Sequence, residues 1–470
     1  MTRTILSITA LLCATVIAWG QNSVQVVAAP EGANLKDTYS VRVRVPGGVW
    51  QKVDTYAFAV AHNGVPQRTV DTVSVAPFSF EGEVEVEITH LKADIDSFRV
   101  RPLSYGIEAR QQGRTLSLKL TRPRYLSIEC NGDIFDNLHL LADSLCSPPA
   151  HADITFAPGL HKIDGDSLPI PSNSTVYIAP GAVVKGWLCV ADAEDVRVLG
   201  QGIILPSDGH GGVEVRRSRR VLVDGPLTTR LPIGESDSVE MRNAKVFSSF
   251  AWGDGFNLYG CSYIRQHHLF ARTSDDCSTV YCTRMGYHGS SHHIRISDAV
   301  YWPDVAHPIM IGIHGDIDKN EEVHHVVYED IDVLEHCEYQ VDYQGCIAIN
   351  DGDNVLVHDL TFKNFRIESM REGMLLNLRV CFNQKYCRAP GRGISNITLS
   401  NISYTGAKPN IGIITGYNEE RVIEGLHFEG LTVNGLPVYD AMPERPTWYK
   451  TADFAPFFIG EHVHDVTFAL

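Results

Sequence analysis

The most constraining feature of this chain is a succession of brief strand-like runs, punctuated by Gly or Asn, that begins at about Tyr125. The runs return at intervals of roughly 20 to 30 residues, a period typical of solenoids in which each coil buries its apolar face against its neighbours. No long amphipathic helix interrupts them, which disfavours an α/β fold. They include Ser174–Ile178, Asp195–Leu199, Arg220–Val223, His293–Ile296, Val323–Tyr328, Asn354–His358 and Ile394–Ile402. We therefore expect an all-β chain with a right-handed parallel β-helix over residues 125–470.

The residues before this region follow a different pattern. Runs such as Tyr39–Val45 and Glu83–Ile88 alternate apolar and polar side chains and are separated by turn residues such as Pro46-Gly47-Gly48. Alternation with period two is typical of an antiparallel sheet that has one face in water. We expect a β-sandwich of immunoglobulin-like size over residues 21–124, which either binds glycan or braces the helix.

The first twenty residues predict a signal peptide. Arg3 is followed by an apolar run from Ile5 to Ile17 and then by Ala18-Trp19-Gly20, a small-x-small cleavage pattern. No later stretch reaches the roughly 18 apolar residues that a membrane span requires. We therefore expect residues 1–20 to be removed and the mature protein to be secreted or periplasmic, with no membrane span.

The charge of the chain disfavours nucleic acid as a partner, and its cysteines leave the presence of disulfides open. The formal net charge of -16 disfavours nucleic acid, because phosphate binding needs clustered Lys and Arg. Export permits disulfides, and two near pairs are candidates, although buried free thiols are an equal alternative. These pairs are Cys130/Cys146 and Cys381/Cys387. We expect a monomer that needs no cofactor.

Histidine pairs such as His292-His293 and His324-His325 raise the possibility of a metal site. Neighbouring residues on a strand point to opposite faces of the sheet, so one pair cannot readily chelate one ion. We predict no metal.

Two segments carry the chemistry, and they begin 22 residues apart, which is one coil of such a helix: Asp254–Tyr259 and Asp276–Tyr281. Stacking them places Asp254 over Asp276, with Asp275 beside it. Adjacent strands lie about 4.8 Å apart, so the three carboxylates converge. The same register places Phe256 over Ser278, Leu258 over Val280 and Tyr259 over Tyr281.

Carboxylates this close repel one another and raise at least one pKa. Glycoside hydrolysis uses one protonated and one ionised carboxyl group, whereas a structural protein gains nothing from the repulsion. The alternative is that these aspartates only cap turns in solvent. The stacked triple favours catalysis.

These residues resemble known enzyme families. The segments Trp252–Gly255 and Thr273–Cys277 resemble the aspartate motifs of glycoside hydrolase family 28, the polygalacturonases, and family 49, the dextranases and isopullulanases. Family 49 enzymes also place a β-sandwich before the β-helix. The resemblance implies that Asp275 is the general acid, that Asp254 and Asp276 activate the attacking water, and that the anomeric centre is inverted.

The resemblance also implies residues that bind substrate. His307 falls at the position of the polygalacturonase Gly-His-Gly histidine, although a core histidine is the alternative. Asn377-Leu378-Arg379 occupies the place of the Arg-Ile-Lys motif and retains one of its two cations. A galacturonate carboxylate favours paired cations, so the loss favours a neutral glycan, dextran-like, over pectin.

Other side chains bear on this choice of substrate. Trp252 places an aromatic ring where a sugar can stack, and Tyr281 is a second predicted contact. Tyr301 and Trp302 are either a further platform or core residues. Two arginines, Arg272 and Arg284, are potential replacements for the missing cation, which keeps a pectin hydrolase as an alternative.

Two further functions remain open. A β-helical polysaccharide lyase needs an Arg or Lys base and usually bound calcium, and the sequence offers carboxylates without an obvious base. A non-catalytic glycan-binding β-helix would use the aromatic and acidic side chains for binding alone. Dependence on calcium and an unsaturated product that absorbs ultraviolet light would indicate the lyase, whereas binding without release of reducing ends would indicate the glycan-binding protein.

Overall fold

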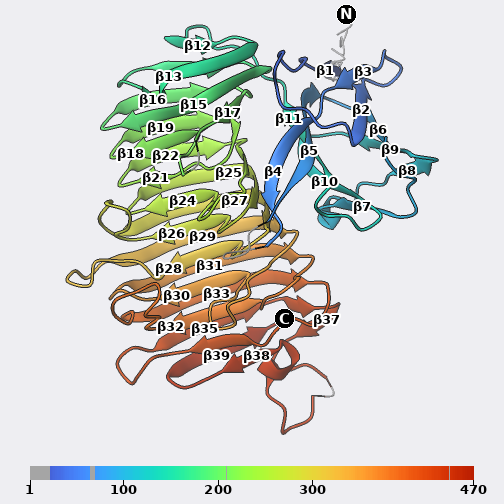
Figure 1. Cartoon of the computed structure of the whole chain (residues 1–470). Helices are drawn as coiled ribbons and strands as arrows, with labels where there is room; N and C mark the ends of the chain where they lie inside the picture. Colours follow the sequence, from blue (N-terminus) through green and yellow to red (C-terminus); the bar gives the residue numbers. More distant parts are fainter. Residues whose placement is uncertain (1–21, 64–68, 208, 444) are drawn as a thin grey trace, which may run out of the picture.

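The computed structural model describes residues 22–63, 69–207, 209–443 and 445–470. The predicted signal peptide, residues 1–20, lies outside the described residues. A tall stack of coils forms most of the molecule, and a smaller β domain lies along its side (Figure 1). Within the described ranges, no helix is both long and apolar enough to cross a membrane.

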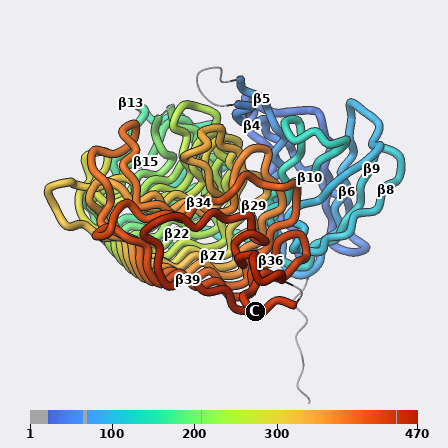
Figure 2. The backbone as a smooth tube through the Cα atoms, turned by 90° about the horizontal axis from the view of Figure 1, so that it is seen from below, coloured from blue at the N-terminus to red at the C-terminus, as the bar shows by residue number. Residues whose placement is uncertain are grey.

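The stack is a parallel β-helix, as predicted. Its strands form one 28-stranded sheet in which strands of successive coils pair in parallel, apart from one antiparallel pair near the C-terminal end. Figure 2, a view from below the stack, shows the coils lying one upon another. The strands are β12 (Ile154–Phe156), β13 (Gly159–Pro169), β14 (Thr175–Ile178), β15 (Ala182–Ala191), β16 (Glu194–Leu199), β17 (Ile203–Leu205), β18 (Val213–Arg216), β19 (Arg219–Asp224), β20 (Leu227–Thr228), β21 (Ile233–Gly234), β22 (Asp237–Arg242), β23 (Lys245–Phe247), β24 (Phe256–Tyr259), β25 (Ser262–Thr273), β26 (Ser278–Tyr281), β27 (Ser291–Pro303), β28 (Ile309–Gly312), β29 (Glu322–Val333), β30 (Ile347–Asp351), β31 (Leu356–Ile367), β32 (Leu376–Val380), β33 (Gly393–Tyr404), β34 (Gly412–Thr415), β35 (Ile423–Glu429), β36 (Leu431–Val433), β37 (Leu436–Val438), β38 (Phe457–Ile459) and β39 (Val463–Ala469).

The helix core consists of columns of aliphatic side chains. Short strands from β24 to β34 alternate with long ones, and each short strand contributes one residue to a column that is fully buried. Because the coils are in register, every residue of a column packs between two others about 4.8 Å away. One column comprises Leu258, Val280, Ile311, Ile349, Leu378 and Ile414.

The long strands bend at a column of left-handed residues. Asp298, Asp330, Asn364 and Asn401 all have φ between 51° and 59°. Asn and Asp tolerate this conformation best after Gly. The Asn364 amide donates to Asp330 at 3.0 Å and the Asn401 amide donates to Asn364 Oδ1 at 3.1 Å. Asparagine therefore marks the corners of the stacked coils, as its recurrence in the sequence predicted.

The first domain consists of two sheets whose buried side chains form one core. The central pairings of the five-stranded sheet are antiparallel, as the alternating pattern predicted. Among the described residues, two short 3-10 helices lie outside the sheets: η1 (Leu103–Tyr105) in the first domain and η2 (Thr451–Phe454) between β37 and β38 of the stack. The six-stranded sheet comprises β1 (Ser23–Gln25), β4 (Tyr56–Ala61), β5 (Val70–Glu81), β7 (Phe98–Arg101), β10 (Arg124–Cys130) and β11 (Leu138–Ser144), and the five-stranded sheet comprises β2 (Tyr39–Arg44), β3 (Gln51–Val53), β6 (Val84–His90), β8 (Arg110–Gln112) and β9 (Thr115–Leu120).

The sheet of the first domain continues past residue 124, where the sequence predicted a boundary. Strand β10 pairs with β7, and β11 pairs with β5 in parallel, so the sheet extends to Ser144. These two strands are buried almost throughout. Leu126 and Leu140 point into the sandwich core, whereas Tyr125 and Leu141 point toward the helix. Burial on both faces removes the alternation that identified the earlier strands, which is why the prediction ended too early.

The two domains share an apolar interface on the outer side of the helix. Strands β4, β5, β10 and β11 supply one side, and successive coils supply the other. The helix contributes Val183, Ile203, Leu227, Phe247, Phe270, Val300, Trp302 and Leu334, and the first domain contributes Tyr56, Phe58, Val60, Val73, Val75, Tyr125 and Leu141. The first domain is therefore packed along the helix rather than tethered to it (Figure 1).

The described cysteines are all free thiols. Cys130 is part of the sandwich core, whereas Cys146 lies beside Tyr177 of the helix. Cys381 and Cys387 belong to one small apolar cluster but are also unbonded. Of the two alternatives that the sequence left open, the structure shows buried thiols.

Candidate active site

The register of the coils brings the predicted carboxylates together. Strand β24 pairs with β26 so that Phe256 lies beside Ser278 and Tyr259 beside Tyr281, as predicted. The turn before each strand is in register too, because Gly255 N donates to Asp276 O at 2.8 Å. Asp254 and Asp276 therefore occupy equivalent positions in successive coils.

Asp276 is buried and accepts three hydrogen bonds. The Tyr281 hydroxyl donates to Oδ2 at 3.0 Å, and both the backbone N and Nδ1 of His307 contact Oδ1, at 3.1 and 2.7 Å. Three donors fix the orientation of this carboxylate. His307 therefore acts on the site through Asp276.

The His307 ring lies between two acceptors. Nδ1 faces the Asp276 carboxylate and Nε2 faces the carbonyl oxygen of Tyr343, so both nitrogens must carry a proton to donate. Burial alone lowers the pKa of His307, but the Asp276 charge and hydrogen bond, reinforced by Glu338, outweigh it and raise the pKa above 6.5. The ring is therefore held as a cation beside the carboxylates.

His336, the next imidazole, is held in the opposite state. Its Nδ1 donates to the Ala306 carbonyl at 3.0 Å, and its Nε2 accepts from Gly345 N at 3.1 Å. Burial, then the charge of His307, lower the pKa of His336 to about 3. Neighbouring histidines thus differ in charge because their partners differ.

Asp254 and Asp275 have raised pKa values. Burial, followed by repulsion from Asp276, raises the pKa of Asp254 to about 7, although Arg230 and Arg284 act against the rise. Burial, then the charges of Asp254 and Asp276, raise the pKa of Asp275 well above its usual range. The raised pKa values favour the protonated forms of Asp254 and Asp275, beside the hydrogen-bonded carboxylate of Asp276.

Four residues that sequence reasoning missed surround the carboxylates. The Asn257 amide donates to Asp254 at 2.5 Å, and the Arg230 guanidinium donates to Asn257 Oδ1 at 3.4 Å. Glu338 and Tyr343 belong to the segment between β29 and β30 and act on the charge states of Asp275 and His307. The position of Asn257 in the aspartate motif was a usable signal, but nothing in the sequence places the other three here.

Of the predicted aromatic contacts, only Trp252 is available to a ligand. Its side chain is 77% exposed on the turn before Asp254. Tyr281 is 5% exposed, and its hydroxyl is occupied by Asp276. Tyr301 and Trp302 are fully buried, so they are core residues and form no sugar platform.

Asn377 and Arg379 lie two coils beyond His307, in strand β32. The Asn377 amide donates to the carbonyl of Gln344 at 2.6 Å, and Arg379 donates to the carbonyl of Asp342 at 2.7 Å. Both therefore support the segment that carries Tyr343. The structure does not bring them into hydrogen-bonding contact with the three aspartates.

The two arginines considered as replacement cations differ in position. Arg272 is fully buried in the domain interface and cannot reach a substrate. Arg284 is exposed and lies close enough to Asp254 to lower its pKa. Only Arg284 remains as a substitute.

The two rings of each histidine pair do not point to opposite faces, as was expected for straight strands. His293 and His325 have φ of 54° and 53°, so the chain turns there and the rings of each pair meet. The Nδ1 atoms are 2.9 Å apart in His292-His293 and 2.7 Å apart in His324-His325. Even so, among the described residues no group of three or more His, Cys, Asp or Glu is arranged to hold a metal ion.

One solved structure shares this fold, and others resemble it more distantly. Dex49A from Penicillium minioluteum aligns with a TM-score of 0.61 at 14% identity and covers 94% of this chain and 96% of that one. A family 28 exopolygalacturonase from Yersinia enterocolitica aligns with a TM-score of 0.47 at 9% identity, covering 82% and 96%. The catalytic domain of a GH87 α-1,3-glucanase in complex with nigerose gives 0.32 at 11% identity, covering 91% and 98%.

The likeness to Dex49A extends over nearly the whole chain, first domain included. The resemblance expected from the aspartate motifs is therefore confirmed at the level of the fold. No protein-family model and no curated protein matches the sequence.

Proposed function

We propose that the protein hydrolyses glycosidic bonds of a polysaccharide or oligosaccharide with inversion of the anomeric centre. The observation that carries the proposal is the convergence of Asp254 and Asp275, both with raised pKa values, on Asp276, whose carboxylate His307 and Tyr281 hold in place. Carboxyl groups with unequal proton affinities are what acid–base cleavage of a glycosidic bond requires. A fold shared with Dex49A is compatible with this activity but does not assign it.

The charge states support distinct roles. Asp275, whose pKa burial and the neighbouring carboxylates raise well above its usual range, gives its proton to the glycosidic oxygen as the bond to the anomeric carbon breaks. Asp276, oriented by Tyr281 and His307, and Asp254, oriented by Asn257, together accept a proton from the attacking water. Water attacks the face opposite the leaving group, so the anomeric centre inverts.

A neutral α-glycan of the dextran type is the substrate we favour. Arg379 is used to support a loop, and Arg272 is inaccessible, so the paired cations that suit a uronate are not assembled at these positions. The exposed Trp252 offers a ring for stacking on a neutral sugar. Pectin is the second candidate, because exposed Arg284 lies near Asp254. The predicted signal peptide supports export, and we retain the prediction of a monomer.

The test compares the wild type with Asp275→Asn on dextran, pullulan, polygalacturonate and arabinan, measuring new reducing ends. Asp298→Asn is the matched control, because Asp298 belongs to the following coil but pairs with His268 on the outer surface. We expect release by the wild type and the control only, with the inverted anomer seen first by NMR. An unsaturated product that absorbs ultraviolet light would indicate a lyase, and binding without release would indicate a glycan-binding protein.

A further inference from the structure

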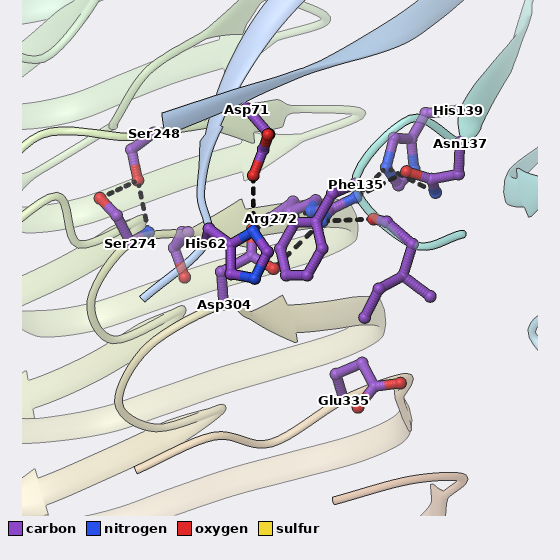
Figure 3. A network of polar contacts seen from close by, with 12 residues as sticks. His62, Asp71, Phe135, Asn137, His139, Ser248, Arg272, Ser274, Asp304 and Glu335 are labelled. Atoms are coloured by element: carbon purple, nitrogen blue, oxygen red, sulfur yellow. Dashed lines mark hydrogen bonds and ion pairs between the residues drawn. The ribbon is translucent and has the colours of Figure 1, made fainter. Parts of the chain in front are cut away.

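A fully buried arginine lies three residues before the candidate acid, at the junction of the two domains. The Arg272 guanidinium donates to five acceptors, and Figure 3 shows it between the helix and the first domain. On the helix side, it binds both carboxylate oxygens of Asp304, at 2.9 and 3.1 Å. On the other side, it binds Asn137 Oδ1 at 2.8 Å, His139 Nε2 at 3.1 Å and the Ile134 carbonyl at 2.7 Å.

Aromatic rings and burial make this junction rigid. Trp302 stacks on the guanidinium at 4.1 Å, and Phe135 of the first domain lies 5.6 Å away. Burial, then the charges of Arg272 and Arg101, lower the pKa of His139 far enough to keep it neutral, as an acceptor must be. A planar guanidinium with every N–H oriented by an acceptor has one available position.

Arg272 and Asp304 begin the two turns that carry the candidate site. The turn that follows Arg272 carries Asp275 and Asp276. The turn that begins at Asp304 carries His307. The turns are bonded to each other, since Asp304 N donates to Thr273 O at 2.7 Å and Cys277 N donates to His307 O at 2.8 Å. Displacing the guanidinium would therefore displace both turns.

The turn of Asp254 is attached to the same unit. Ser274 N donates to Ser248 Oγ at 3.0 Å (Figure 3). Ser274 Oγ donates to the Phe250 carbonyl at 2.7 Å. The position of Arg272 is thus transmitted to all three aspartates through short segments of chain.

We infer that Arg272 is a positioning residue through which the first domain holds Asp275, Asp276 and His307 in catalytic geometry. The first domain is then part of the active-site scaffold and not a separate binding module. The expected loss of kcat rests on the proposed function. The expected displacement of the aspartate turns rests on the contacts of Arg272 alone. Misplacement of reacting groups by about 1 Å costs roughly 100-fold in rate, which sets the expected effect.

The test uses Arg272→Met with Lys245→Met as its matched control. Lys245 is also a buried cation between the domains, bonded to Asp143 at 2.7 Å and to the Gly225 carbonyl at 2.9 Å. It lies at the start of β23, in the coil before Arg272, and neither bond involves the turns of Asp275 and His307. We expect both variants to lose thermal stability, and only Arg272→Met to lose roughly 100-fold in kcat per folded molecule with little change in KM. Equal kcat in the two variants would overturn the inference.

Two milder variants cover the case in which Arg272→Met does not fold. Arg272→Lys keeps the charge but cannot reach five acceptors, and Asn137→Ala removes one acceptor from the first domain only. Each is expected to lower kcat, by about tenfold for Asn137→Ala. Wild-type kcat in both would contradict a positioning role.

Chemical labelling tests the positioning role of Arg272 without a glycan, and therefore independently of the proposed function. Carbodiimide reacts with protonated carboxyl groups, so labelling at neutral pH followed by peptide mass spectrometry reports on Asp275 in the intact protein. We expect the Arg272 variants to change labelling of this peptide and Lys245→Met to leave it unchanged. If the wild type cleaves no glycan, the proposed function fails, and unchanged labelling in the Arg272 variants would independently overturn the positioning role.

Discussion

Two clusters of charged side chains lie close together in the same coils and differ in the sign of the charges that they bring together. Arg272 and Asp304, both fully buried, neutralise each other across two hydrogen bonds. Asp275 and Asp276, three and four residues later, are placed beside Asp254, a third carboxyl group. The buried charges at the domain junction are of opposite sign, whereas the candidate site gathers three acidic groups, with the His307 cation beside one of them.

The stacking of equivalent positions explains how a repetitive fold can create a reactive site. Stacking repeats the same position every coil, so an aspartate in consecutive coils necessarily faces its equivalent. Burial and repulsion then raise the pKa values of Asp254 and Asp275. The comparison can be tested by removing charge from one group at a time.

The largest effect is expected for Asp275→Asn. Asparagine cannot donate the proton that cleavage requires, so activity should fall by roughly 10²- to 10⁴-fold. Thermal stability should stay unchanged or rise, because the substitution relieves repulsion from Asp254 and Asp276. Reducing-end assays and thermal unfolding measure the two quantities, and a large loss of stability would mean that Asp275 belongs to the structural group.

Asp304→Asn should show the reverse pattern in stability. It leaves Arg272 buried beside a neutral amide, and breaking such a pair costs about 3–5 kcal/mol. The comparison variant Asp298→Asn removes a partly exposed pair with His268 and should cost about 1 kcal/mol or less. Urea unfolding gives both free energies, and similar values would remove the distinction between the two groups.

The pH dependence of stability should reveal the strain at Asp254. Its pKa is about 7 in the fold and about 3.9 when unfolded, so the folded state binds the extra proton between these values. The stabilisation is complete below pH 4 and is lost as pH rises toward 7. Relative to Asp254→Asn, the wild type should therefore lose on the order of 1–3 kcal/mol of unfolding free energy over this range. Parallel urea-unfolding profiles at pH 4, 5.5 and 7 would show that Asp254 is not strained.

The smallest effect is expected for Tyr281→Phe. The variant removes one of three donors to Asp276 and keeps the ring, so kcat should fall by about tenfold. Tyr259→Phe is the control, because Tyr259 occupies the same column 6.0 Å away and no hydrogen bond joins it to Asp276. Equal rates in the two variants would assign Tyr281 to packing alone.

Much of the fold and the central site followed from local patterns. The seven strand-like runs all overlap strands of the helix, and the 22-residue spacing placed Asp254 over Asp276 correctly. The predictions failed where burial hid the pattern, as in β10 and β11, or where a left-handed residue bent a strand, as at His293. Trp302 and Arg272 were considered as substrate contacts because nothing local shows that another domain covers them.

The coil length, the inward columns and the meeting of the aspartates all follow from local sequence, because register between adjacent coils depends only on residues one coil apart. The tertiary structure alone decided which charges are paired. Asn137 reaches Arg272 from 135 residues away, and Tyr343 reaches His307 from 36 residues away by way of a long return segment. Such contacts depend on how coils and domains pack in space, and the same local sequence is compatible with many packings.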